Sequence, residues 1–146
     1  MICIGFDYGD RRTGVAVSDA SGFLAGGVAT ITASSMTKTA EEAIRLIGKY
    51  RAELAVVGLP LNMDGSEGTR AETARAFGAM LVSLSGGKIP VLFCDERLST
   101  VEAHGILSDI DVRKKKRKKV IDTLSAELIL QSYLDGERKK KAENGR

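Results

Sequence analysis

The stretch IGFDYGDRRTGVAVSD, residues 4–19, joins two apolar segments through a short polar turn and follows each with an aspartate. Residues 2–7 are apolar on both faces, as in a central strand, and residues 13–18 form a second apolar segment. Because only residues 8–12 link them, the pair is predicted to be an antiparallel hairpin. Asp7 stands at the tip of the first strand, where a carboxylate is unfavourable unless a positive group meets it.

The segments that follow alternate between two periodicities. In residues 34–50, apolar side chains recur at helical spacing after serines and threonines that can cap a helix. Further strands are predicted at 27–32, 53–58 and 89–94, and further helices at 67–84, 100–107 and 121–135. Right-handed crossovers place the last two strands parallel to the first. The predicted fold class is α/β, with a mixed five-stranded sheet, an antiparallel hairpin and helices on both faces.

The length of the chain, 146 residues, suits one compact domain. We expect this domain to occupy residues 1–136, with a basic flexible tail over 137–146. Apolar residues make up 43% of the chain, but no apolar run approaches the roughly 18 residues of a transmembrane helix. The N-terminal segment has no basic region or cleavage site typical of a signal peptide. A membrane-spanning or secreted protein is therefore not expected.

The net charge of +3 conceals an asymmetry. Seven consecutive basic side chains form the run RKKKRKK: Arg113, Lys114, Lys115, Lys116, Arg117, Lys118 and Lys119. Without them the chain has 15 basic and 19 acidic side chains. Like charges in a row repel one another, so we expect a mobile basic loop at about 109–119 that contacts nucleic-acid phosphates. A solvated loop or helix end without a partner is the alternative.

Acidic residues follow the predicted strands at the edge where ligands bind in open α/β sheets. Asp7 ends the first strand, Asp95 and Glu96 follow the strand at 89–94, and Asp122 begins the final helix. Close carboxylates repel each other unless a cation neutralises them. Oxygen ligands without histidine or cysteine suit Mg²⁺ or Mn²⁺, and two such ions can activate water against a phosphodiester.

Each acid also has a purely structural interpretation. Asp7 could cap the turn, Asp122 could sit favourably at a helix N-terminus, and Asp95 could pair with Arg97. Only the joint placement of these acids, next to the basic run, favours the metal site.

Two other site classes are not supported. Cys3 and Cys94 have no CxxC partner, so they are predicted to be free thiols and not zinc ligands. The glycines match neither GxGxxG nor the phosphate-binding P-loop, so a nucleotide-binding fold is not indicated.

Four motifs occur in order along the chain: FDYGDRRTGVAVSD, VVGLPLNMDGSEG, DERLSTVEA and IDTLSAELILQSYLD. Together they resemble the YqgF/RuvX family, bacterial proteins described as pre-16S rRNA nucleases and as Holliday-junction-resolvase-like. The resemblance covers about residues 2–135. It implies an RNase H-like fold and a cytoplasmic protein.

The same resemblance implies which residues form the site. It carries metal-binding acids onto Asp7, Glu96 and Asp122. The DER motif offers both Asp95 and Glu96, which strand alternation puts on opposite faces; we take Glu96 as the ligand and Asp95 as the fallback. The loop GLPLNMDGSEG and the residues Arg70, Arg11 and Arg12 are expected to contact the nucleic-acid backbone.

Three functions from two classes remain open. The first is a metal-dependent endonuclease that processes the 5′ end of pre-16S rRNA in ribosome biogenesis. The second is a resolvase of Holliday junctions in DNA, which would use the same chemistry. The third is a nucleic-acid-binding factor that cuts nothing. The expected partner is structured RNA or branched DNA, and we expect a monomer or a weak homodimer.

Overall fold

The computed structural model describes residues 1–97 and 114–144, and within 114–122 only the backbone. Five strands form one sheet in the order β3-β2-β1-β4-β5. Their bounds are Cys3–Asp7 for β1, Arg12–Ser18 for β2, Ala25–Thr32 for β3, Leu54–Leu59 for β4 and Val91–Asp95 for β5. Pairing is antiparallel among β1, β2 and β3, and β4 lies parallel to both β1 and β5. The predicted mixed five-stranded sheet and its hairpin are confirmed.

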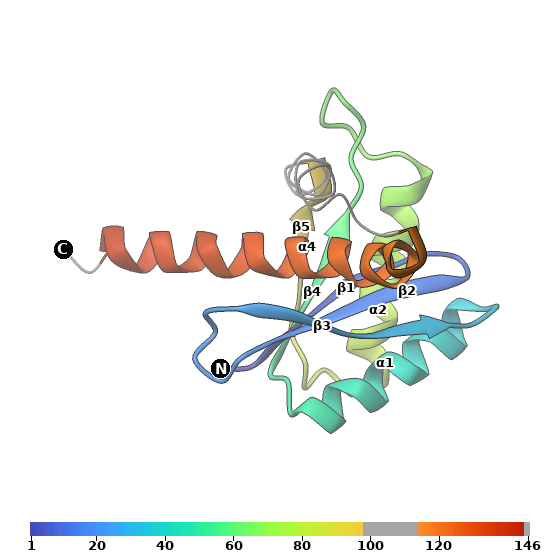
Figure 1. Cartoon of the computed structure of the whole chain (residues 1–146), viewed down its shortest axis with the longest axis horizontal. Helices are drawn as coiled ribbons and strands as arrows, with labels where there is room; N and C mark the ends of the chain where they lie inside the picture. Colours follow the sequence, from blue (N-terminus) through green and yellow to red (C-terminus); the bar gives the residue numbers. More distant parts are fainter. Residues whose placement is uncertain (98–113, 145–146) are drawn as a thin grey trace.

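Helices cover both faces of the sheet (Figure 1). Helices α1 (Met36–Tyr50) and α2 (Thr69–Leu84) pack on one face, and α4 (Lys114–Asn144) packs on the other. Strand alternation divides the core accordingly: Ile4 and Phe6 belong to the cluster under α1 and α2, whereas Cys3 belongs to the cluster under α4. Asp7 continues the Cys3 series, so it lies on the α4 face.

Helix α1 begins and ends with recognisable signals. Ser35 accepts a hydrogen bond from the Lys38 amide, which satisfies one of the unpaired donors at the helix start. At the other end, Arg51 adopts the left-handed conformation and its amide bonds back to the Gly48 carbonyl. The N-cap matches the serines that the sequence places before the helix.

Helix α4 approaches the sheet closely because Gly5 has no side chain. A Cβ placed on Gly5 would lie 2.8 Å from Leu130 Cβ and 3.3 Å from the Ala126 carbonyl oxygen. Side chains of the helix also reach the edge strand β3: Gln131 accepts a hydrogen bond from the Ala25 amide at 2.9 Å, and Glu127 accepts one from Gly27 at 2.7 Å. The helix is thus fixed along the whole width from β1 to β3.

Helix α4 is longer at both ends than the predicted helix at 121–135. It begins at Lys114, within the expected basic loop, and runs to Asn144, through most of the expected tail. Lysine, arginine and glutamate are strong helix formers, and no proline interrupts them. Arg138 pairs with Asp135 and stacks 3.9 Å from the centre of the Phe23 ring, which holds this part of the helix against the turn between β2 and β3. The rest of the expected loop, residues 109–113, lies outside the described residues, as does the predicted helix at 100–107.

Both cysteines are free, as predicted; Cys3 is buried under α4 and Cys94 is half-buried. In the part of the chain that the structure describes, no helix combines the length and apolarity needed to span a membrane.

The close approach of α4 to Gly5 generates a stability prediction. Gly5→Ala should lower the free energy of unfolding by about 1–3 kcal/mol, because the new methyl group would overlap Leu130. Gly48→Ala is the matched control, since nothing lies within 4 Å of a Cβ there and alanine favours the helix. Urea unfolding should show the first midpoint falling and the second unchanged or rising. Equal midpoints for the two variants would contradict this packing.

Candidate active site

The carboxyl ends of three neighbouring strands meet at one edge of the sheet. β1, β4 and β5 are mutually parallel, so Asp7, Leu59 and Asp95 end the three strands side by side. Glu96 follows Asp95 directly. The sequence left open whether Asp95 or Glu96 faces the same side as Asp7.

Strand alternation in β5 answers that question. Phe93 packs in the cluster under α1 and α2, whereas Cys94 packs in the cluster under α4. Alternation then carries Asp95 to the side of Phe93, and Glu96, the first residue after the strand, lies beside Gly58 together with Ile129 of α4. Glu96 therefore shares the α4 face with Asp7.

Gly58 in β4 provides the space for the Glu96 carboxyl group. A Cβ on Gly58 would collide with Glu96 Oε1 and with Ile129 Cδ1 of α4. The Glu96 side chain consequently lies across β4, between the strand and the helix, and reaches towards β1. This position is largely shielded from solvent by the packed helix.

Asp7 and Glu96 interact directly. Burial of Glu96, the negative charge of Asp7 and a side-chain hydrogen bond with Asp7 together raise the pKa of Glu96 to about 8. The Arg70 guanidinium acts in the opposite direction and lowers that pKa. At neutral pH the pair therefore holds a proton between its two carboxyl groups.

Asp95 has a different partner. It accepts hydrogen bonds from Arg97 Nε and from Nη2, the latter at 2.7 Å, and also from the Arg97 amide at 2.9 Å. These bonds hold the pKa of Asp95 below its usual range. The structural interpretation of Asp95, a pair with Arg97, is thus the observed one, and the pair lies on the face opposite Glu96.

A pocket of about 250 Å³ opens beside Glu96. The turn after β1 and the start of α2 line it, with Pro60 at the end of β4. Arg70 is the cation on its wall, and Tyr8 closes its floor by stacking on Phe77 with ring centres 4.7 Å apart. The Glu96 carboxyl group and the exposed Arg70 guanidinium thus border one space.

The loop between β4 and α2 forms a small hairpin over this edge, seen as the green projection beyond the strand ends in Figure 1. An isolated bridge pairs Leu61 with Glu67, and the Asn62 amide donates to the Ser66 carbonyl at 2.9 Å. Arg97 Nη1 donates to the Met63 carbonyl at 3.3 Å. The segment GLPLNMDGSEG is therefore an ordered structure tied to the residue that follows Glu96.

The other predicted site residues are placed less completely. Arg11 and Arg12 are exposed in and beside the turn that follows Asp7. Residues 114–119 form the first turns of α4, and Arg113 lies outside the described residues. The backbone of Asp122 is helical, but its side chain is outside the described set. Among the side chains that are described, no three acids, cysteines or histidines form a metal-binding group.

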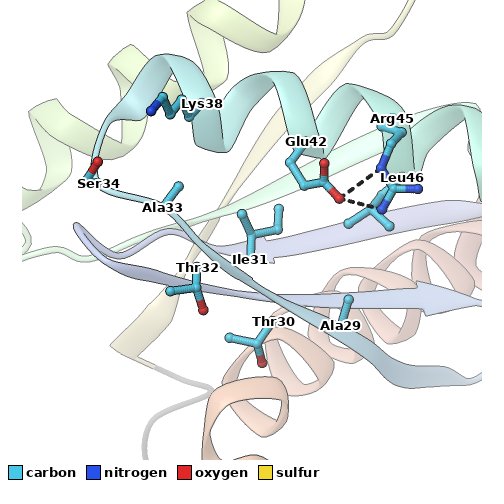
Figure 2. A pocket seen from close by; sticks show the side chains of 10 residues that line it. All are labelled: Ala29, Thr30, Ile31, Thr32, Ala33, Ser34, Lys38, Glu42, Arg45 and Leu46. Atoms are coloured by element: carbon cyan, nitrogen blue, oxygen red, sulfur yellow. Dashed lines mark hydrogen bonds and ion pairs between the residues drawn. The ribbon is translucent and has the colours of Figure 1, made fainter.

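A second pocket, of about 670 Å³, was not anticipated from the sequence. It lies between β3 and α1, where Figure 2 shows Glu42 paired with Arg45 at one end and Lys38 at the other. In Figure 2, Ile31 of β3 points towards α1, whereas Thr30 and Thr32 point to the other side of the strand. β3 and α1 are consecutive elements of the chain, and the pocket forms where the helix folds back along the strand that precedes it.

Comparison with known proteins matches this architecture. A family model described as "RuvX: Holliday junction resolvase" covers residues 1–136. A "Putative pre-16S rRNA nuclease" from Caldanaerobacter subterraneus subsp. tengcongensis is 44% identical over 94% of this chain and 99% of its own length. One of the same name from Halothermothrix orenii is 48% identical over 95% and 98%.

A solved structure gives independent support for the fold. T. thermophilus RuvC in complex with Holliday junction substrate superposes with a TM-score of 0.59 at 15% identity, covering 94% of this chain and 96% of that one. The likeness confirms the expected RNase H-like fold.

The raised pKa of Glu96 predicts a pH-dependent stability. The unfolded chain releases this proton near pH 4.5 and the folded protein near pH 8, so folding loses stability as pH rises between these values. Glu96→Gln removes this cost and should raise Tm by about 3–10 °C at pH 8 in EDTA, with little change at pH 4.5.

Asp95→Asn is the matched control for that experiment. Arg97 lowers the pKa of the Asp95 carboxyl group, so the negative charge of Asp95 stabilises the fold at pH 8. The Asp95→Asn variant should therefore have a slightly lower Tm than wild type at this pH. Thermal unfolding curves across pH 4.5–8 distinguish the two. A Glu96→Gln variant that melts lower than wild type at pH 8 would contradict the carboxyl pair.

Proposed function

The chain belongs to the RuvX family, described as Holliday junction resolvase, and we propose that it is a divalent-metal-dependent endonuclease that hydrolyses phosphodiester bonds. Relatives at 44–48% identity are named for pre-16S rRNA, which supports that precursor as the substrate, and we propose that its 5′ end is the part processed. A role in rRNA processing implies a cytoplasmic location. The observation that carries the proposal is the contact between Asp7 and Glu96 at the strand ends.

The residues present fit a divalent cation. Two carboxyl groups forced together in a shielded position repel each other, and a cation between them removes that repulsion. Their oxygens are the hard ligands that Mg²⁺ and Mn²⁺ prefer. The nearby Cys94 thiol has its pKa raised by burial and by Asp95 and Glu96, so it stays protonated and is not a competing soft ligand.

Asp122 is proposed as the third acid of the site. The carbonyl of Ala126 lies against Gly5, which precedes Asp7 by two residues in β1. Residue 122 begins the helical turn before Ala126, and this backbone position supports its placement near the end of β1. We propose a two-ion site held by Asp7, Glu96 and Asp122, with Asp95 in a supporting role through Arg97.

Each group has a defined task in hydrolysis. A bound cation supplies positive charge that polarises the phosphate and promotes ionisation of water. Glu96 must release its proton before it can bind the cation, while Asp7 fixes the position of the Glu96 carboxyl group through their hydrogen bond. Arg70, on the pocket wall, is placed to pair with a phosphate oxygen of the substrate. Arg11 and Arg12 extend this cationic surface along the turn.

A four-way DNA junction is the second candidate substrate, because the family description names Holliday junction resolvase. Nothing in the pocket separates the two by chemistry, since both substrates present phosphates and hydrolysis is the same. Contact with the 2′-hydroxyl would distinguish RNA from DNA.

Asp7→Asn should abolish cleavage. We expect a fall of at least 100-fold in the cleavage of a pre-16S rRNA 5′ fragment with Mg²⁺ or Mn²⁺, because a neutral amide cannot balance the cation's charge. The matched control is Asp135→Asn, an exposed aspartate at the far end of α4, which should cut at the wild-type rate. Cleavage is measured under single-turnover conditions.

The same assay on a four-way DNA junction decides the substrate. Junction cleavage without RNA cleavage would favour the resolvase function. Salt-sensitive binding of either nucleic acid without any cleavage by wild type would reject the nuclease and leave a binding factor.

The basic start of α4 is proposed to contact phosphates. Five lysines are replaced by alanine, which preserves helix propensity: Lys114, Lys115, Lys116, Lys118 and Lys119. The affinity for RNA should fall and the slope of log K against log salt should become shallower, because fewer counterions are released on binding. Alanines at Lys139, Lys140 and Lys141 form the control at the other end of the helix. Identical slopes for wild type and the first variant would exclude this segment from the interface.

A further inference from the structure

The side chain of Met63 is held in solvent at the tip of the loop between β4 and α2. It is 97% exposed, more than any other large apolar side chain in the described part of the chain. Single exposed apolar residues are common on protein surfaces, so exposure alone carries no inference. The structure of the loop and its position relative to Glu96 give the exposure its significance.

The loop is internally ordered, so the exposure of Met63 is built into its backbone. The Gly65 amide donates to the Asn62 carbonyl at 2.9 Å, and Gly65 has a φ of +87°, a conformation that favours glycine. Asp64 Oδ1 accepts hydrogen bonds from the Ser66 amide at 2.9 Å and from the Ser66 hydroxyl at 2.6 Å. These bonds fix the backbone of the turn and keep Met63 at its tip.

The tip of the loop is also tied to the candidate site. Arg97 donates one hydrogen bond to the Met63 carbonyl and others to the Asp95 carboxylate. Asp95 and Arg97 flank Glu96, so these bonds connect the loop to the end of β5 beside Glu96. At the loop base, Glu67 accepts two hydrogen bonds from Arg75 of α2, at 2.6 and 2.8 Å. Met63 therefore stands at a fixed offset from the carboxyl pair.

The chemistry of the tip does not suit a phosphate. Asp64 carries a negative charge next to Met63, and its side chain is occupied by Ser66. An unbranched, polarisable thioether instead suits the flat face of a base, and apolar side chains of this kind insert between base steps in nucleic-acid complexes. We propose that Met63 wedges between two bases of the substrate next to the cleaved phosphate and unstacks them. This inference rests on the proposed nuclease function.

The wedge gives the enzyme a preference among substrates. Separating stacked bases costs free energy, which is least where the bases are unpaired or bulged. A substrate with an unpaired nucleotide beside the cut already has this distortion and does not need Met63. A continuously paired substrate needs Met63 to separate its bases.

The test compares Met63→Ala with Met63→Leu, which restores an apolar wedge, and with Leu24→Ala as the control. Leu24 is a 61% exposed apolar residue in the β2–β3 turn, at the opposite end of the sheet. The probe is the pre-16S rRNA 5′ fragment with 2-aminopurine on either side of the cleavage position, which is first mapped with the wild-type protein. For the binding measurement each variant also carries Asp7→Asn, so that the RNA is bound but not cleaved. Cleavage of a fully paired and a bulged version of the RNA is measured in parallel.

We expect 2-aminopurine fluorescence to increase when the RNA binds the protein with Met63 intact or with Met63→Leu. Binding of the Met63→Ala protein should give no such increase. Met63→Ala should cut the paired RNA roughly 10–100-fold more slowly but the bulged RNA less than about threefold more slowly. Leu24→Ala should match wild type throughout.

Other outcomes overturn the inference in distinguishable ways. Retained fluorescence in Met63→Ala, or equal losses on both RNAs, rejects the wedge while the nuclease function stands. A wild type that binds and unstacks RNA but cuts nothing rejects the nuclease function and keeps the wedge. A wild type that does not bind the RNA rejects both.

Discussion

The contact between Asp7 and Glu96 is the constraint around which the site is organised. Two carboxyl groups meet in a shielded position because the parallel strands β1 and β5 end at the same edge and both acids lie on the α4 face. The lack of a side chain at Gly58 leaves room between them. The resulting repulsion lowers the stability of the fold as the pH rises, and in the proposed function a bound cation would relieve it.

Much of the fold could be predicted from sequence periodicity. The hairpin of residues 2–18, the order of strands and helices, and the two-faced sheet followed from apolar patterns and turn residues. The choice between Asp95 and Glu96 could not follow from them, because it depends on which side of β5 faces α4. That is known only once Phe93 and Cys94 are seen to pack in different clusters.

The ends of α4 and the structure of the loop at 60–68 could not be predicted from the sequence either. A run of lysines favours a loop through repulsion and a helix through intrinsic propensity, and local reasoning does not rank the two. The expectation that the loop meets the nucleic-acid backbone rested on the family resemblance. Its hydrogen bonds to Arg97, and the exposed Met63 that they hold in place, depend on a residue more than thirty positions away.

The bonds from α4 to β3 have a consequence for the behaviour of the protein in concentrated solution. An edge strand with free, outward-pointing amides can recruit a strand from another molecule and start aggregation. On β3, the amides of Ala25 and Gly27 are already occupied by Gln131 and Glu127, and the latter brings a negative charge to the edge. Helix α4, which carries the basic segments, thus also hinders the pairing of this part of β3 with a strand of a second molecule.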